Sequence, residues 1–239
     1  MKLRVVLLLS VFLSASGIAL SRNDSVHIME YLPVKHSDSK KWIERYQKDI
    51  DRYVRENIET GESDCDALFL GSSSINMWND IYEDMAPLKV VRRSYGGASI
   101  RDMLYNYSVI ARGFKPKNIV LYVENDLCGC PEELPEHETF DLFRIFTLRI
   151  LRDYPRVPFF IVSLKPSPAR EKAREKQKIV NRLLQSFAEN TPDVFFIDVA
   201  SAMYDERGNL RTDIFLDDNL HLNRKGYDIW KSIFKAAIK

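Results

Sequence analysis

Five short runs of apolar residues, separated by longer stretches with helical periodicity, constrain the fold of this chain more than any other feature of its sequence. The runs cover residues 67–70, 88–91, 119–123, 158–164 and 194–199. Continuous apolar runs of this length are typical of strands that are buried on both faces of a sheet. The helical stretches cover residues 40–59, 100–112, 140–154, 169–189 and 223–237. Strands that alternate with helices predict a parallel sheet with helices on both faces.

The rest of the chain predicts one folded domain behind an export segment. With 239 residues, 45% of them hydrophobic, the chain is large enough for one well-packed domain, which we expect over residues 39–239. Residues 22–38 are polar and irregular and predict a leader to the fold. Residues 1–21 place Lys2 and Arg4 before a short apolar run that ends in small residues, which is typical of a signal peptide. We therefore expect an exported protein, periplasmic or secreted, that contacts a membrane only if this segment remains as an uncleaved anchor.

The charge pattern argues against nucleic acid or an anionic membrane as a partner. The chain has 35 Lys and Arg against 34 Asp and Glu, a formal net charge of +1, so no bulk field of either sign exists. Residues 169–176 repeat Ala-Arg-Glu-Lys, and because the signs alternate this segment predicts the solvated start of a helix. The core face of that helix is expected to carry Ile179, Leu183, Leu184 and Phe187.

The cysteines predict no metal or redox centre. Cys128 and Cys130 are separated by one residue rather than the two of a zinc or redox motif, and Cys65 stands far from both. We expect a structural or incidental role for all three. In an oxidising compartment one pair could form a disulfide bond.

Residues with chemical potential follow the predicted strands. Gly71-Ser72-Ser73-Ser74 comes directly after the first strand, where a sharp turn would expose a hydroxyl at the start of a helix. Serine is also a common helix cap, so this segment alone leaves both interpretations open. A phosphate-binding loop is excluded because the lysine and the glycine spacing of that motif are absent.

Two further segments offer groups that stabilise negative charge. Residues 95–99, Tyr-Gly-Gly-Ala-Ser, follow the second strand and present a backbone amide or form an ordinary turn. Asn125 follows the third strand, where its side-chain N–H is a candidate donor to an oxyanion; an Asn-Asp turn is the alternative.

The fourth segment precedes the last helix. His221 lies in an apolar setting, and Asp218 is three residues before it, a spacing at which the carboxylate can hold one nitrogen of the ring. A packed histidine, or a metal site that also uses Asp217, is the alternative. Together the four segments supply a nucleophile, a base, an orienting carboxylate and oxyanion donors, which is the set that acyl transfer requires.

In their order along the chain these segments resemble the sequence blocks of the SGNH, or GDSL-type, hydrolases. Residues 68–75 resemble the nucleophile block in a Gly-Ser-Ser-Ser variant, with Ser73 in the place of the nucleophile. Residues 95–97 are similar to the second block, with Gly97 as the oxyanion amide and Gly96 as the alternative. Residues 124–126 resemble the Gly-x-Asn-Asp block, although Val123 replaces its glycine. Residues 218–223 resemble the Asp-x-x-His block most closely.

The resemblance implies a flavodoxin-like, three-layer α/β/α fold with about five strands. It also implies a serine esterase in which His221 takes the proton of Ser73, Asp218 orients His221, and Ser73, Gly97 and Asn125 form the oxyanion hole. No cofactor or metal is implied, and the expected substrate is a small-molecule, lipid or carbohydrate ester. The alternatives are an O-acyltransferase that uses a carbohydrate hydroxyl as acceptor and a non-catalytic binding domain on the same fold.

Overall fold

The structure, a computed structural model, describes residues 44–61, 63–129 and 132–238. The expected signal segment, the polar leader, the first residues of the expected domain and Cys130 lie outside these ranges.

One parallel sheet of five strands forms the centre of the fold, in the order β2-β1-β3-β4-β5. The strands are β1 (Ser63–Gly71), β2 (Val90–Ser94), β3 (Phe114–Tyr122), β4 (Phe159–Val162) and β5 (Val194–Ile197). The chain adds β2 on one side of β1 and then β3, β4 and β5 on the other. The direction of winding therefore reverses between β1 and β3, and in such sheets ligands bind at the carboxyl ends of the strands beside this reversal.

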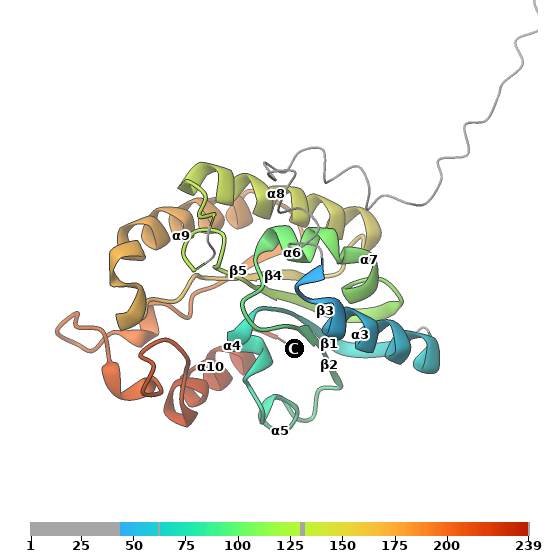
Figure 1. The fold of residues 1–239 in the computed structure, drawn as a ribbon, viewed down its shortest axis with the longest axis horizontal. Coiled ribbons are helices and arrows are strands. Elements are labelled where there is room, and N and C mark those ends of the chain that lie inside the picture. Colours follow the sequence, from blue (N-terminus) through green and yellow to red (C-terminus); the bar gives the residue numbers. More distant parts are fainter. Residues whose placement is uncertain (1–43, 62, 130–131, 239) are drawn as a thin grey trace, which may run out of the picture.

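Helices cover both faces of the sheet and complete a three-layer α/β/α fold (Figure 1). One face is covered by α3 (Gln47–Thr60), α6 (Ile100–Tyr105), α7 (Tyr107–Ile110), α8 (Glu136–Asp153) and α9 (Arg174–Glu189). The other face is covered by α4 (Ser73–Asn76), α5 (Ile81–Asp84) and α10 (Arg224–Ala237). The predicted fold class is confirmed.

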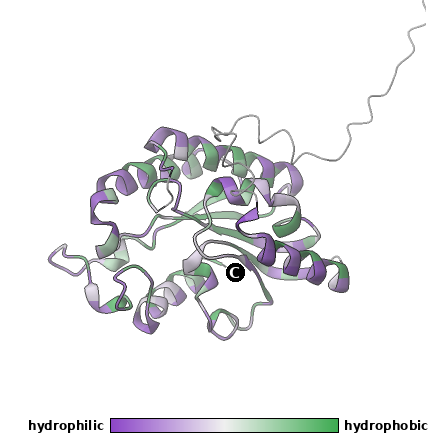
Figure 2. Ribbon diagram, in the orientation of Figure 1, coloured by the Kyte–Doolittle hydropathy of each residue, from purple (hydrophilic) through white to green (hydrophobic). Residues whose placement is uncertain are grey.

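The continuous apolar runs arise because both faces of each central strand are buried. In β1, Leu68 and Leu70 pack into the core on the side of α8 and α9, whereas Ala67 and Phe69 pack into the core on the side of α10. Figure 2 shows the same arrangement, with hydrophobic strands at the centre and helices that turn their polar sides outward. Alternating side chains thus enter two different cores, and none of these positions tolerates a polar residue without a partner.

The second strand begins later than its apolar run suggested. Residues 88–91 were the predicted strand, but β2 covers Val90–Ser94. The strand continues because its two arginines have partners: Arg92 donates to two backbone carbonyls at the end of α4, each at 3.0 Å. Arg93 pairs with Glu56 at 2.8 Å and lies over the ring of Tyr53. Partners far away in the sequence satisfy these charges, so an apolar pattern misses this half of the strand.

Two predicted helices are interrupted. The helix expected over residues 100–112 is divided into α6 and α7, which meet at Asn106. The helix expected over residues 169–189 begins as a 3₁₀ helix, η2 (Pro168–Ala173), and α9 starts only at Arg174. The backbone at Arg170 is not helical, with φ −116° and ψ 31°.

The prediction of which residues of that helix face the core is also partly wrong. The buried residues of α9 are Gln177, Val180, Leu184 and Ala188. Ile179, by contrast, is 37% exposed. The true buried stripe includes a glutamine, which hydrophobic periodicity cannot detect.

An ionic cluster joins α5 to α10. Asp84 is 4% exposed and accepts hydrogen bonds from the indole of Trp78 at 2.7 Å and from Arg224 at 2.8 Å, while Lys231 lies 3.0 Å away. Burial alone would raise the pKa of Asp84, but these donors outweigh it and hold the pKa well below its ordinary value. The end of α5 is thereby tied to the C-terminal helix α10.

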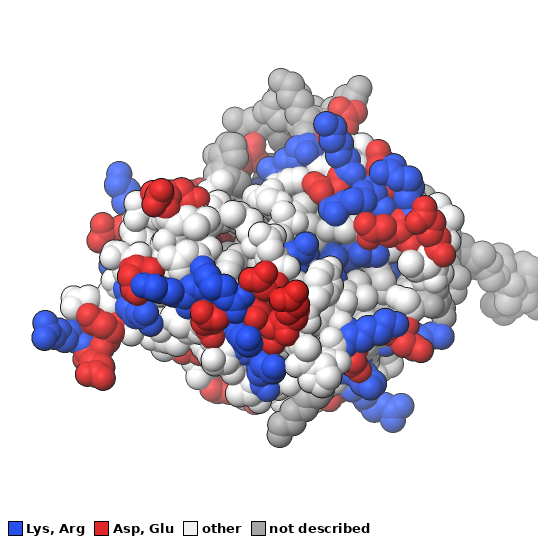
Figure 3. Space-filling view, turned by 90° about the horizontal axis from the view of Figure 1, so that it is seen from below, with Lys and Arg blue, Asp and Glu red and all other residues white. Residues whose placement is uncertain are grey.

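On the face shown in Figure 3, Lys and Arg side chains lie beside Asp and Glu side chains and form no large patch of one sign. This agrees with the nearly balanced composition of the chain. Within the described ranges, no helix has the length and apolar character needed to cross a bilayer.

Candidate active site

The turn after β1 exposes one of three adjacent serines. Ser72 and Ser74 are 1% and 2% exposed, whereas Ser73 is only half-buried and is the first residue of α4. The turn is tight: a Cβ on Gly71 would lie 2.6 Å from the carbonyl oxygen of Tyr122 and 2.7 Å from Ile75. Glycine has no Cβ, so the chain can pass close to Tyr122 and Ile75 at this point. The sharp turn that results presents the Ser73 side chain at the edge of the sheet.

Asn125 lies beside this turn, at the end of the neighbouring strand. Gly71 pairs with Tyr122 in the register of β1 and β3, and Asn125 follows three residues later. Its Nδ2 donates to the carbonyl of Ala98 at 2.7 Å, so the amide is held against the loop that contains Gly97. Gly97 has a φ of +76°, a backbone conformation that favours glycine. The φ of Gly96 lies outside this left-handed region, so its backbone does not require glycine.

A single orientation of the Asn125 amide satisfies its neighbours. Oδ1 accepts a 2.6 Å hydrogen bond from Arg170, which can only donate, and Nδ2 faces a carbonyl oxygen, which can only accept. One N–H of the amide is therefore used by Ala98. The second N–H has no acceptor in the described part of the chain.

Arg170 is the main departure from the predicted site. The sequence places it in a solvated helix start, but its side chain is 14% exposed and bridges Asn125 and Glu124, with a 2.6 Å contact to each. The prediction of a solvated segment holds for Glu171 and Lys172, which are exposed, but it is wrong for Arg170, because charge alternation reports only local neighbours. Gly129 makes room for the guanidinium, since a Cβ there would lie 2.3 Å from Arg170.

Glu124 connects this arginine to two further buried polar groups. Glu124 is 4% exposed and accepts from the amide of Gln177 at 3.1 Å. Lys165, 1% exposed, lies 3.7 Å from Glu124 and donates to the carbonyl of Leu220 at 2.7 Å. Burial lowers the pKa of Lys165 below its ordinary value, while Glu124 opposes this shift. These buried groups connect the end of β3 to the loop that carries His221.

His221 is held by Asp218 as the spacing predicts. Nδ1 of His221 lies 2.6 Å from Oδ2 of Asp218, and Oδ1 of the same carboxylate accepts from the backbone N–H groups of Leu220 and His221, each at 2.9 Å. Burial would raise the pKa of Asp218, but these hydrogen bonds lower it to about 2. Since the carboxylate is ionised at neutral pH, Nδ1 carries the proton and Nε2 is the nitrogen with a free lone pair.

Contacts from α10 and η2 bring the His221 loop to the same edge of the sheet. The hydroxyl of Tyr227 donates to the carbonyl of Ser74 at 3.0 Å, and the ring of Tyr227 stacks on Trp78. Ala169, next to Arg170, donates its backbone N–H to the carbonyl of Asn219 at 3.0 Å. The structure therefore gathers Ser73, Gly97, Asn125 and His221 at one edge, but it records no hydrogen bond between Ser73 and His221.

The remaining candidate ligands do not converge. No group of three or more His, Cys, Asp or Glu side chains that could hold a metal ion occurs among the described residues. Cys65 and Cys128 are buried free thiols, and burial raises the pKa of each, to about 11 for Cys65 and to about 12 for Cys128. Thiols with such pKa values are poor nucleophiles at neutral pH.

Asp126 has a structural role. It is 1% exposed, accepts from the backbone N–H of Ile100 at the start of α6, and pairs with Arg101 at 2.7 Å.

Sequence analysis did not identify Arg170, Lys165 and Gln177 as site residues. The available signal was the position of Lys165 directly after an apolar strand, where a buried cation needs a nearby carboxylate.

Comparisons with known proteins support the fold. No family model and no curated protein matches the sequence. Among solved structures, a candidate platelet activating factor from Streptococcus pneumonia has a TM-score of 0.72 at 22% identity, covering 84% of this chain and 96% of that chain. A GDSL-like lipase from Bacteroides thetaiotaomicron has a TM-score of 0.66 at 18% identity, with coverages of 79% and 96%.

A third solved structure, an acetylxylan esterase from Geobacillus stearothermophilus, has a TM-score of 0.59 at 15% identity, covering 74% of this chain and 94% of that chain. The chain thus spans nearly the whole of each of these proteins. These three structures confirm the architecture expected from the sequence and its resemblance to the GDSL-type fold.

Proposed function

We propose that this chain, on the fold it shares with the GDSL-like lipase and the acetylxylan esterase, is a serine hydrolase that cleaves carboxylic esters. One observation carries the proposal: the accessible Ser73 hydroxyl lies at the same sheet edge as a histidine whose Nδ1 is already held by an ionised carboxylate. This combination supplies a nucleophile and a base with a free nitrogen.

The reaction would start with Ser73. Nε2 of His221 accepts the proton of the Ser73 hydroxyl as the oxygen attacks the ester carbonyl, and Asp218 stabilises the resulting imidazolium. His221 then gives the proton to the leaving alcohol. Water then attacks the acyl-enzyme while His221 again acts as the base, and the acid is released.

Negative charge on the carbonyl oxygen would be stabilised by three donors. The second N–H of Asn125 is one, and the backbone N–H groups of Ser73 and Gly97 are the others. Asn125 is preorganised because Arg170 and Ala98 hold both ends of its amide before any ligand binds. Removing one such donor typically lowers the rate by about 10²- to 10³-fold.

Export is also part of the proposal. It rests on the basic and apolar residues of the N-terminal segment, which predict delivery to a periplasmic or extracellular substrate. N-terminal sequencing of the protein recovered outside the cytoplasm tests it. A mature chain that begins near Arg22 would support export with cleavage, and recovery of the intact chain from the cytoplasm would contradict it.

The catalytic proposal is tested with a fluorophosphonate probe and a chromogenic acetyl ester. We expect the probe to label Ser73, and we expect Ser73→Ala to lose both labelling and turnover. Ser72→Ala and Ser74→Ala are the matched controls, since those buried hydroxyls should be dispensable for labelling. Turnover that survives Ser73→Ala would refute the proposal.

The same assay separates the alternatives. Labelling of Ser73 with turnover only in the presence of a carbohydrate acceptor would identify an acyltransferase. A folded protein that neither reacts with the probe nor turns over the ester would identify a binding domain.

A further inference from the structure

The two peptide units that precede His221 are each held at both ends. The carbonyl of Leu220 accepts a hydrogen bond from Nζ of Lys165 at 2.7 Å. The N–H of that same unit belongs to His221 and donates to Oδ1 of Asp218 at 2.9 Å. One unit earlier, the carbonyl of Asn219 accepts from a backbone N–H of η2 at 3.0 Å, and the N–H of Leu220 donates to Asp218 at 2.9 Å. Because a peptide unit is planar, contacts at its two ends prevent its rotation and fix the backbone that carries the histidine.

The donors to these two carbonyls belong to the connection between β4 and α9, residues 163–173. Pro166 and Pro168 each have a φ fixed by the ring, which limits the conformations that the connection can adopt. The 3₁₀ helix of this connection also carries Arg170, which orients Asn125. One stiff segment therefore contacts both the oxyanion donor and the loop that carries the histidine.

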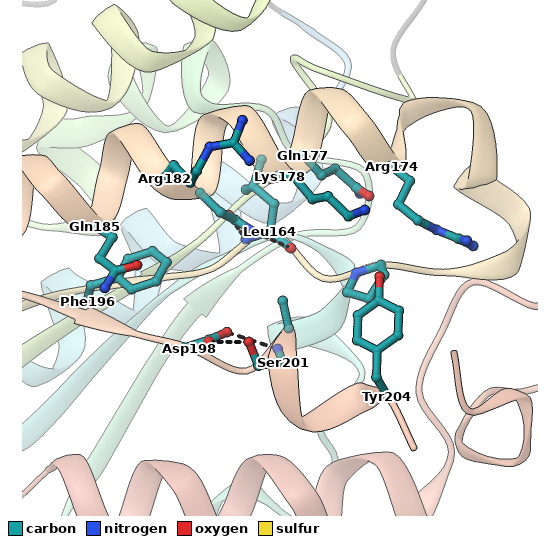
Figure 4. A pocket seen from close by; sticks show the side chains of 13 residues that line it. Leu164, Arg174, Gln177, Lys178, Arg182, Gln185, Phe196, Asp198, Ser201 and Tyr204 are labelled. Atoms are coloured by element: carbon teal, nitrogen blue, oxygen red, sulfur yellow. Dashed lines mark hydrogen bonds between the residues drawn. The ribbon is translucent and has the colours of Figure 1, made fainter. Parts of the chain in front are cut away.

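Side chains of α9 fix the start of this connection. Asn181 accepts from the N–H of Leu164 at 2.7 Å and donates to the carbonyl of Leu164 at 2.9 Å. Figure 4 shows Leu164 alongside α9, in the wall of a hollow that Gln177 also lines. Gln177 donates to the carbonyl of Lys165 at 3.0 Å. The backbone of Lys165 is thus held by α9, independently of the contacts that its side chain makes.

The ammonium group of Lys165 is buried between the two halves of the site. It lies 3.7 Å from Glu124 at the end of β3 and 5.7 Å from the centre of the Phe215 ring. Glu124 lies closer to Arg170, at 2.6 Å, so one carboxylate serves two cations. Burial of an ammonium group is unfavourable unless charges and hydrogen bonds compensate it. A buried lysine that shares its counter-charge, at the edge of a reaction centre, is a candidate for a functional role.

We propose that Lys165 is a positioning residue for the reaction at Ser73: it holds the peptide unit before His221 and thereby fixes the imidazole relative to the nucleophile. This role rests on the proposed function, because it acts through the base of that reaction. Without Nζ of Lys165, the carbonyl of Leu220 loses its donor and the peptide unit can rotate. The N–H of His221 then moves away from Asp218, and the ring moves with it. A displacement of about 1 Å at a reacting group can lower the rate about 100-fold.

The test removes the ammonium group and follows both the rate and the histidine. We expect Lys165→Met to lower kcat for the chromogenic acetyl ester about 10- to 100-fold and to leave KM within about threefold of the wild-type value. In the same variant we expect the downfield proton NMR resonance of the His221 Nδ1–H to shift or broaden, because the geometry of its contact with Asp218 changes. This resonance is measured without substrate and reports the histidine directly.

Arg149→Met is the matched control, because Arg149 is also a buried cation but lies on α8, over the ring of Tyr107. We expect it to leave both kcat and the resonance unchanged. Lys165→Gln is the second variant, for use if Lys165→Met does not fold. Its amide can still face Glu124 but is one atom too short to reach Leu220, so we expect the same losses.

Wild-type kcat in the Lys165 variants, or a lower kcat with an unchanged resonance, would each overturn the proposal. An equal decrease of kcat in Arg149→Met would also overturn it, since the loss would then follow from removing any buried cation. An inactive wild-type protein would refute the esterase proposal and this role with it. An active wild-type protein whose kcat does not depend on Lys165 would refute only the role of Lys165.

Discussion

Arg170 donates a 2.6 Å hydrogen bond to the amide oxygen of Asn125, and its other amino group lies 2.6 Å from Glu124. A planar guanidinium can make both contacts at once in one fixed geometry. The orientation of Asn125 is thus set before a substrate arrives. A preorganised donor costs no rearrangement when charge develops on the substrate, which is the condition under which such donors are most effective.

Arg170→Lys should lower kcat and kcat/KM together. A lysine keeps the charge beside Glu124 but cannot hold both partners, so Asn125 loses its fixed orientation, and we expect a decrease of about 10- to 100-fold. Steady-state kinetics with the chromogenic ester measure it. Lys172→Ala, an exposed cation in the same 3₁₀ segment, should leave kcat unchanged. Equal kcat for Arg170→Lys and the wild type would show that Arg170 does not position Asn125.

Gly71→Ala should destabilise the protein and impair the Ser73 turn. The new Cβ would lie 2.6 Å from a backbone oxygen, which cannot rotate away as the end of a side chain can, and such overpacking costs about 1–3 kcal/mol. Urea unfolding measures the loss. Gly96→Ala serves as the control, since no atom lies within 4 Å of a Cβ built there. Similar stability of the two variants would contradict this account of the turn.

Asp84→Ala should lower the free energy of unfolding by about 3 kcal/mol, because it leaves the indole N–H of Trp78 unpaired and removes the link between α5 and α10. Asp80→Ala is the comparison, since Asp80 is 52% exposed and also pairs with Arg224. An exposed pair of this kind contributes about 0–1 kcal/mol. Chemical denaturation of the two variants under the same conditions decides whether burial makes the difference.

Asp218→Asn should lower kcat at least about 100-fold, because the amide no longer selects the tautomer of His221 that leaves Nε2 free. The pKa of Asp218 is lowered from 3.8 to about 2 in the folded protein. Its stabilising effect is therefore complete above about pH 4 and is lost as the pH falls toward 2. The ratio of wild-type to variant activity should stay constant from pH 5 to pH 8. A ratio that decreases already near pH 5 would show that the carboxyl group is protonated there.

Residues 67–74 and 218–223 show how much local sequence determines. An apolar run bounded by glycine is enough to predict the fully buried second half of β1 and the turn after it, because a strand buried on both faces leaves that pattern, whereas the first half of β1, from Ser63, carries polar residues and was not predicted. Likewise, the spacing of Asp218 and His221 is enough to predict their contact, because three residues of chain allow only a short separation. The order of such segments predicts that they meet, since parallel strands end at the same edge of a sheet.

Arg92, Arg170 and Gln177 show what the tertiary structure alone decided. Each is a polar residue with partners distant in the chain; Arg170 and Asn125, for example, are 45 positions apart. Periodicity assigns such residues to solvent, because it reports the average environment of a residue type and contains no information on long-range partners. Burial of a charge becomes favourable only when the fold supplies its counter-charge and hydrogen bonds, so the buried groups around Asn125 exist only in the assembled molecule.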